Sequence, residues 1–229
     1  MKKICSLSIL LLFSLMLAVS TASAIPVYHL TFIGAEGGSL GGIYTYPYGF
    51  EINGTGNYPL ICDTFTRQIN PGDSWDAYVR NMASINASNV GNLFFGSVNG
   101  GGNGAVQYYM AAGLLFEDAR TNPSNATYDN WAIWYTFEQG AVTSSGGWGS
   151  LSAGDQATIQ GDSAAAISAA ALDTPSQFSN IVIYTPTDGT GQEFFGWNTP
   201  APEPASLALF GSGVLGVAGL LRRKLKAQR

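Results

Sequence analysis

Hydrophobic segments at both ends of the 229-residue chain confine the part that can fold outside a membrane to its middle. Residues 205–221 carry no charge, and as a helix they would be about 25 Å long, slightly less than the thickness of a bilayer core. Basic side chains follow at once, and positive charge favours the cytoplasmic side of a membrane. They are Arg222, Arg223, Lys224, Lys226 and Arg229. The pattern predicts a C-terminal transmembrane helix over 205–221, with a buried C-terminal helix as the alternative.

The N-terminal segment has the three parts of a secretory signal peptide. Lys2 and Lys3 supply positive charge, residues 9–19 are strongly apolar, and residues 22–24 read Ala-Ser-Ala, a small-residue cleavage site. We therefore expect a signal peptide over 1–24 and an exported mature chain.

The expected ectodomain, residues 25–199, is long enough for one compact domain with a sizeable core. Its basic side chains are Arg67, Arg80 and Arg120, and 14 acidic residues oppose these three, which gives a net charge of −11. Such a domain lacks the positive surface that nucleic acid requires, so we expect no nucleic-acid partner. Cys62 is its single cysteine, so an internal disulfide is impossible.

Hydrophobic periodicity predicts strands, then helices, then strands. The expected strands cover 26–32, 41–50, 58–65, 178–184 and 192–197, with the tyrosines of 41–50 on one face.

Apolar residues at helical spacing after Asp73 or Ser74 (Trp75, Tyr78, Val79, Met82) predict a first helix. Further helices are expected after a glycine-rich loop at 96–104, from Thr127 through Tyr135, and over 163–172. This order predicts an α+β ectodomain, a β sandwich or barrel with a helical insert, beside the N-terminal signal helix and the C-terminal transmembrane helix.

Few residues carry recognisable enzyme chemistry. The single histidine, His29, is expected to be a surface or strand residue. No paired-cysteine or histidine motif predicts a metal site, and no motif predicts a cofactor. Four aspartates that could contribute to a calcium site lack the alternating spacing of a binding loop, so we expect solvated carboxylates. These are Asp63, Asp118, Asp129 and Asp188.

Three segments together resemble the motifs of bacterial surface thioester domains: residues 60–63 around Cys62, residues 130–134 (Asn-Trp-Ala-Ile-Trp) and residues 191–195 around Gln192. The resemblance implies an internal thioester between the Cys62 sulfur and the Gln192 side-chain carbonyl, formed with loss of ammonia. A surface amine or hydroxyl would then open it and leave a covalent attachment. It also implies a supporting role for Asn130, Ala132 and Trp134.

The chain departs from this family pattern at Ile61, Asp63, Asp129 and Gly191. An Asp63 carboxylate beside Cys62 is expected to disfavour the thiolate by charge repulsion. A buried structural thiol and an intermolecular disulfide therefore remain alternatives to the thioester.

The C-terminal tail resembles the PEP-CTERM sorting signal through Pro202, Glu203 and Pro204, the apolar span and the basic end. Such tails have also been labelled an ice-binding protein C-terminal domain, which says nothing about binding ice. The resemblance implies handling by an exosortase-type transpeptidase in the cell envelope of bacteria that make exopolysaccharide, with transient anchoring in the cytoplasmic membrane.

Together these features predict an exported, non-enzymatic structural or adhesion protein of an exopolysaccharide or biofilm matrix. The alternative is a secreted carbohydrate-binding protein or glycoside-active enzyme, because exposed Tyr and Trp can stack on sugar rings.

Overall fold

The computed structural model describes residues 25–197, and residues 25–196 of this part belong to one compact unit. The signal peptide expected at 1–24, the transmembrane helix expected at 205–221 and the sorting motif at 202–204 lie outside the described residues. Within the described range, no helix combines the length and the hydrophobicity needed to span a membrane.

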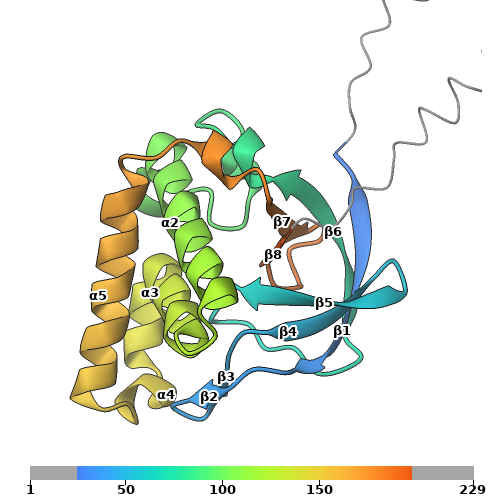
Figure 1. Cartoon of the computed structure of the whole chain (residues 1–229). Coiled ribbons are helices and arrows are strands. Elements are labelled where there is room, and N and C mark those ends of the chain that lie inside the picture. Colours follow the sequence, from blue (N-terminus) through green and yellow to red (C-terminus); the bar gives the residue numbers. More distant parts are fainter. Residues whose placement is uncertain (1–24, 198–229) are drawn as a thin grey trace, which may run out of the picture. The chain divides into compact units, whose positions relative to one another are not determined.

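The strands form a closed barrel in the order β1-β4-β5-β8-β7-β6, which β6 closes by pairing with β1 (Figure 1). Its members are β1 (Val27–Ala35), β4 (Tyr48–Ile52), β5 (Thr55–Cys62), β6 (Ser74–Asn81), β7 (Ile181–Pro186) and β8 (Phe194–Trp197). The barrel pairs the first strands of the chain with the last ones, since β8 lies against β5 and β7 lies against β6.

Aromatic side chains fill the barrel. In β1 the buried residues alternate with more exposed ones, as a strand with one face toward the core requires. The rings of Phe50, Trp75 and Phe194, from three different strands, meet with centroids 4.7 to 6.1 Å apart. Such pairs stabilise the interior beyond the burial of their area.

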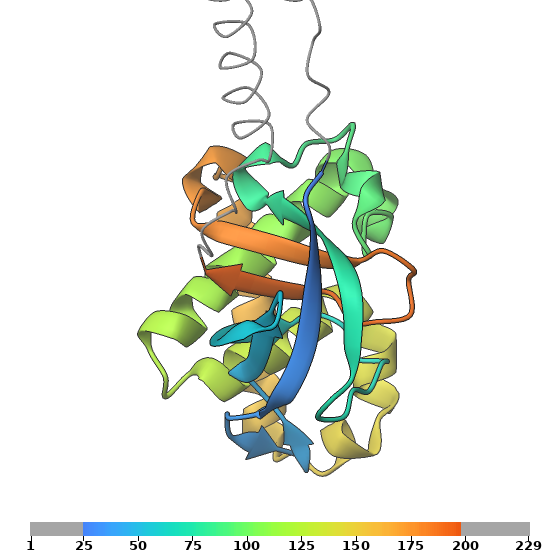
Figure 2. The same ribbon diagram turned by 90° about the vertical axis from the view of Figure 1, so that its right-hand side faces the viewer.

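The helices come from the long connection between β6 and β7 and lie on one side of the barrel (Figure 1). Figure 2 is turned so that the strands stand in front of them. The helices are α2 (Gly102–Thr121), α3 (Ala126–Ser144), the single turn α4 (Gly146–Gly149) and α5 (Ala153–Ala170). The expectation of an α+β, barrel-like domain with a helical insert is therefore confirmed.

The helix expected after Asp73 or Ser74 is wrong: residues 74–81 form strand β6. Trp75 and Ala77 are buried while their immediate neighbours are exposed, so the burial follows period two. Pairing with β1 on one side and β7 on the other overrides the helical spacing of the large side chains.

The strand expected over 41–50 is also wrong in part. The chain instead forms a small hairpin, β2 (Ser39–Leu40) with β3 (Ile43–Tyr44), and starts β4 only at Tyr48. Pro47 separates the two because it lacks the N–H that a central strand needs. The tyrosines therefore do not share one face: Tyr44 is exposed, whereas Tyr46 and Tyr48 are buried.

The expected helices exist but extend further than their apolar patterns indicated. The short helix expected from Thr127 is the 19-residue α3, and the alanine-rich one expected from 163 begins ten residues earlier, at Ala153. Ser152 and Asp155 form a capping box that fixes this start. Of the glycine-rich stretch 96–104, residues 96–101 form a loop with one 3₁₀ turn, η3 (Val98–Gly100), and α2 already begins at Gly102.

Candidate functional site

Cys62 and Gln192 meet where β5 ends and β8 begins. The Cys62 sulfur lies 3.2 Å from Gln192 Oε1, although the two residues are 130 positions apart in sequence. The antiparallel pairing of β5 with β8 places Cys62 opposite Phe194, two residues after Gln192, and so brings the two side chains together. Both are buried, with exposed fractions of 2% for Cys62 and 5% for Gln192.

Asn130 holds the end of β5 in place. This buried residue of α3 donates from Nδ2 to the carbonyl oxygen of Cys62 at 2.8 Å. Its Oδ1 accepts a hydrogen bond of 2.8 Å from the backbone N–H of Tyr46. Two bonds to main-chain groups fix the position of the cysteine, and the neighbouring Ala132 is fully buried in the same helix.

The Gln192 amide is fixed at both of its polar atoms. Nε2 donates to the backbone carbonyl of Arg67, while Oε1 faces the Cys62 sulfur. The Arg67 guanidinium donates to the carbonyl of Gly191 at 2.6 Å and lies 4.3 Å from the centroid of the Phe94 ring. Gly191 itself packs on the indole of Trp75, where a Cβ atom would approach to 2.7 Å. A larger residue at position 191 would collide with Trp75, so this position requires glycine.

Trp134 completes the surroundings of the thiol. It is 2% exposed, and its buried indole N–H has no partner at normal hydrogen-bond geometry among the described residues. The nearby indole N–H lowers the pKa of Cys62, but less than burial raises it. A buried N–H of this kind is available to an oxygen or sulfur that becomes negative during acyl transfer.

The thiol is held in its neutral form. Burial, and then the Asp63 carboxyl, raise the pKa of Cys62 well above its usual value, and the opposing contributions of Thr64 and Trp134 are smaller. The sulfur also lies 3.2 Å from the Thr64 carbonyl oxygen, so the S–H can point to either of two acceptors.

A cavity of about 970 Å³ connects this pair with the surface. Cys62, Gln192 and Trp134 line its inner part, and the exposed Tyr44 and Gln68 line its outer part. The arrangement places a sulfur and an amide carbon at the end of a path that a small nucleophile can enter.

Asp63 and Glu193 lie next to Cys62 and Gln192, and sequence reasoning did not identify them as a pair. Both carboxyls are completely buried. The expectation of a solvated Asp63 is wrong, because the strand places it opposite Glu193 in the core. The sequence feature that could have indicated this pair is that an acidic residue directly follows both Cys62 and Gln192.

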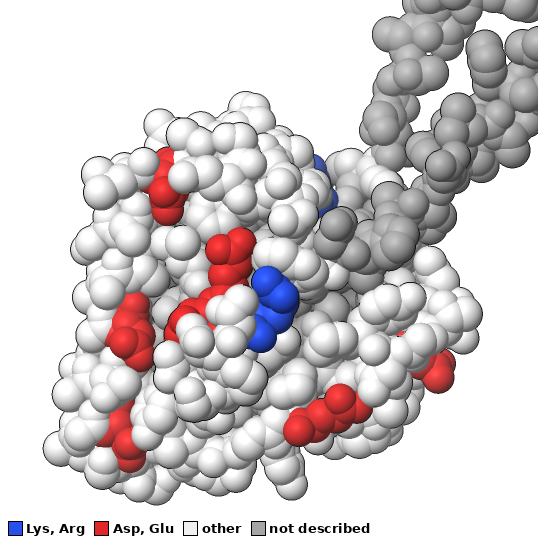
Figure 3. All heavy atoms as spheres, in the orientation of Figure 1, with Lys and Arg blue, Asp and Glu red and all other residues white. Residues whose placement is uncertain are grey.

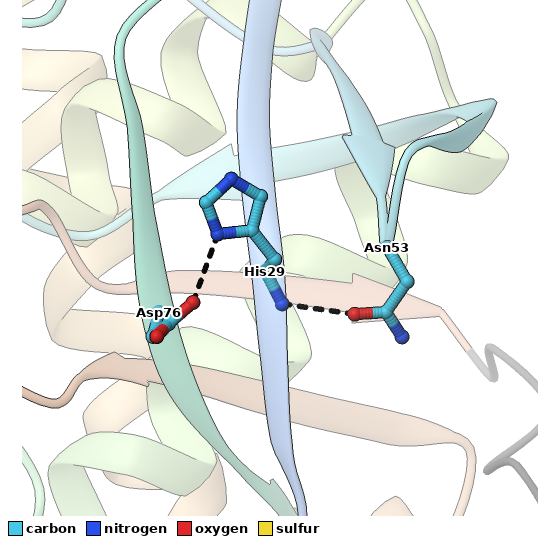
Figure 4. Close-up of polar contacts among 3 residues, drawn as sticks. All are labelled: His29, Asn53 and Asp76. Atoms are coloured by element: carbon cyan, nitrogen blue, oxygen red, sulfur yellow. Dashed lines mark hydrogen bonds and ion pairs between the residues drawn. The ribbon is translucent and has the colours of Figure 1, made fainter.

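The other candidate residues lie apart from this site. His29 is on the outer face of β1, where Nδ1 contacts Asp76 Oδ1 at 2.8 Å (Figure 4). It is exposed, as expected. Asp129 is buried rather than solvated, which corrects a second expectation, whereas Asp188 is exposed.

No group of three or more acidic, His or Cys side chains between residues 25 and 197 is arranged to hold a metal ion. On the face drawn in Figure 3, acidic side chains are scattered and basic ones are few.

Comparison with known proteins identifies the tail. Residues 200–224 match the PEP-CTERM protein-sorting motif. This motif is the recognition signal for exosortase processing and marks the chain as an exported protein. A search of curated proteins gave no match. Among solved structures, the N-terminal thioester domain of a surface protein from Clostridium perfringens is similar, with 10% identity and a TM-score of 0.36 over 75% of this chain and 98% of that one.

Proposed function

We propose that this exported protein attaches covalently to its surroundings through an internal thioester between Cys62 and Gln192. The contact of 3.2 Å between the Cys62 sulfur and Gln192 Oε1, at the inner end of a cavity, is the observation that carries this proposal. The role is structural or adhesive, in an exopolysaccharide or biofilm matrix, and involves no turnover of a substrate.

The chemistry consists of two acyl transfers. In the first, the Cys62 sulfur attacks Cδ of Gln192, the S–C bond forms, the C–Nε2 bond breaks, and the amide nitrogen leaves as ammonia with the thiol proton. In the second, an amine or hydroxyl on the target attacks the same carbon, the C–S bond breaks, and the sulfur regains a proton. The product is an amide or ester that joins the target to residue 192.

The surroundings suit both steps. An amide is a poor acyl donor, so the first transfer needs reactants held in place, which the bonds from Asn130 and Arg67 provide. The Trp134 N–H can stabilise charge that develops on the carbonyl oxygen or the sulfur. The low exposure of the pair limits the water that can reach the product and hydrolyse it.

Burial also weighs against the other two fates of the cysteine. A thiol that is 2% exposed is out of reach of a second chain, which disfavours an intermolecular disulfide. A purely structural thiol would not need an amide oriented toward it. Here the Gln192 Nε2 bond to Arg67 turns Oε1 toward the Cys62 sulfur.

The sugar-active alternative has weaker support. A glycoside hydrolase needs two carboxyl groups that reach the substrate, whereas Asp63 and Glu193, the acidic pair next to the cavity, are completely buried.

The tail fits delivery to the envelope. We propose that the apolar residues 205–221 hold the chain transiently in the cytoplasmic membrane until the exosortase acts, and that the domain reaches the outer surface afterwards.

Methylamine labelling tests the proposal. The full chain, purified in detergent, should gain about 31 Da when methylamine opens the thioester, and peptide mapping should place the methyl amide at residue 192. Cys62→Ala is the matched control and should take up no methylamine. Equal labelling of both proteins, or no labelling of the wild type, would refute the thioester.

A further inference from the structure

The junction of β5 and β8 holds two side-chain pairs on the same two chain segments. Cys62 and Gln192 line the cavity, whereas the next residue on each segment, Asp63 or Glu193, is not among its lining residues. The Asp63 N–H donates to the Glu193 carbonyl at 3.4 Å, so these two acids stand directly across from each other. Whatever holds the acids together therefore also sets the position of Cys62 relative to Gln192.

Glu193 is surrounded by hydrogen-bond donors. Its Oε1 accepts from the Tyr109 hydroxyl at 2.5 Å, and its Oε2 accepts from the Thr185 hydroxyl and from the Phe94 N–H at 3.1 Å. Donors of this kind stabilise a carboxylate, so Glu193 is suited to the ionised form.

Asp63 has the opposite surroundings. Its Oδ1 accepts one bond of 3.0 Å from the Thr64 hydroxyl, and its Oδ2 receives none from any N–H or O–H group among the described residues. A proton on Asp63 removes this deficit, because it can be donated to Glu193. Burial, and then the Glu193 carboxyl, raise the pKa of Asp63 well above its usual range. Burial also raises the pKa of Glu193, but its hydrogen bond with Asp63 opposes this rise.

Without that proton the pair would repel. Two carboxylates directly opposite each other in a buried strand pair are strongly unfavourable. The titratable groups that face the pair are Tyr109 from α2, Cys62 from β5 and Glu138 from α3. None of these three is a cation that could replace the proton.

We propose that Asp63 and Glu193 are positioning residues, whose shared proton holds the ends of β5 and β8 together and so keeps Cys62 against Gln192 for thioester formation. This inference rests on the proposed function and adds a regulation to it: the site forms its thioester while the pair holds one proton and loses this ability when the proton leaves.

The direction of the pH effect separates this mechanism from ordinary thiol chemistry. Rising pH produces more thiolate and would by itself accelerate attack on the amide. Loss of the shared proton works in the opposite direction, because it separates the two strand ends.

The test starts from full-length chain that was recovered from inclusion bodies in guanidinium and has never folded, and whose full calculated mass shows that Cys62 and Gln192 are unmodified. The chain is diluted into detergent buffers, and the fraction that has lost ammonia is measured by mass. For the wild type we expect at least about fivefold less thioester at about pH 9 than at about pH 6. Asp63→Asn keeps an N–H donor toward Glu193 without a titrating proton, so its yield should change less than about twofold over the same range.

Two further variants complete the design. Asp63→Ala removes the donor and should lower the yield at about pH 6 by at least about fivefold. Asp76→Asn, the same substitution at an exposed acid of β6, should keep the pH profile of the wild type. Identical profiles for the wild type and Asp63→Asn would overturn the inference while leaving the thioester intact. A wild type that forms no thioester at any pH would overturn both.

Discussion

Two pairs of polar residues face each other across neighbouring strands of this barrel, with opposite consequences. On the outer surface, His29 lies opposite Asp76 between β1 and β6, and their side chains are 51% and 58% exposed. At the junction of β5 and β8, Asp63 lies opposite Glu193, and both are completely buried. Water screens the first pair, so its contact contributes little to stability.

The second pair has no solvent and must satisfy every oxygen within the protein. The reactive groups that we propose therefore lie at the buried junction and not beside the histidine. The single histidine is the residue that a search for catalytic groups reaches first, yet it is on the solvated face.

Glu193→Ala should lower the free energy of unfolding more than any change to the exposed pair. Removing this side chain leaves the Tyr109 hydroxyl, the Thr185 hydroxyl and the Phe94 N–H without their acceptor inside the core. We expect a loss of about 3–5 kcal/mol in the free energy of unfolding. Denaturant titration followed by tryptophan fluorescence measures it. A loss below about 1 kcal/mol would mean that the buried pair is no more important than the exposed one.

Asn130→Ala should have the next largest effect. It removes the bonds to the Cys62 carbonyl and to the Tyr46 N–H, both of which are buried. We expect a loss of about 2–3 kcal/mol in stability and less thioester, because the end of β5 is no longer fixed. The same denaturant titration and the intact mass report the two effects, and wild-type values in both would exclude Asn130 from the site.

Asp129→Asn tests a third acidic residue, which is buried in α3 near other acids. Burial, with Asp118 and Asp162 nearby, raises the pKa of Asp129 to about 8. An acid whose pKa is raised on folding stabilises the protein at low pH, and this contribution is lost as the pH rises from about 4 to about 8.

The variant should therefore match the wild type near pH 4 and exceed it near pH 8. Solvent screens the half-buried Asp118 and Asp162, which limits the gain to about 1–2 kcal/mol. Thermal unfolding at the two pH values tests this, and a constant difference between the proteins would contradict it.

His29→Ala should have the smallest effect, below about 0.5 kcal/mol, because the contact with Asp76 is exposed. Thioester yield should be unchanged. A clear fall in yield would show that the outer face is coupled to the β5–β8 junction.

The sequence predicted the parts of the fold and site that depend on local pattern. The strand with Cys62, the late strand after Gln192 and the helix with Asn130 and Trp134 all follow from periodicity and short motifs. The match of the tail to a sorting motif likewise needs no tertiary information.

Properties that depend on strand register could not be predicted. The apolar residues of 74–82 fit helical spacing, and only pairing with β1 and β7 makes the segment a strand. The opposition of Asp63 and Glu193 arises only after β5 and β8 pair, since no local pattern links positions 130 residues apart. Burial of Asp129 likewise depends on how α3 packs, which its charge alone did not suggest.

The intact mass of the wild-type chain tests the central claim most directly. We expect a mass about 17 Da below that calculated from the sequence, because ammonia is lost when Cys62 joins Gln192, and no such deficit in Cys62→Ala processed in the same way. A wild-type chain at its full calculated mass, with a Cys62 that reacts freely with iodoacetamide after unfolding, would contradict it.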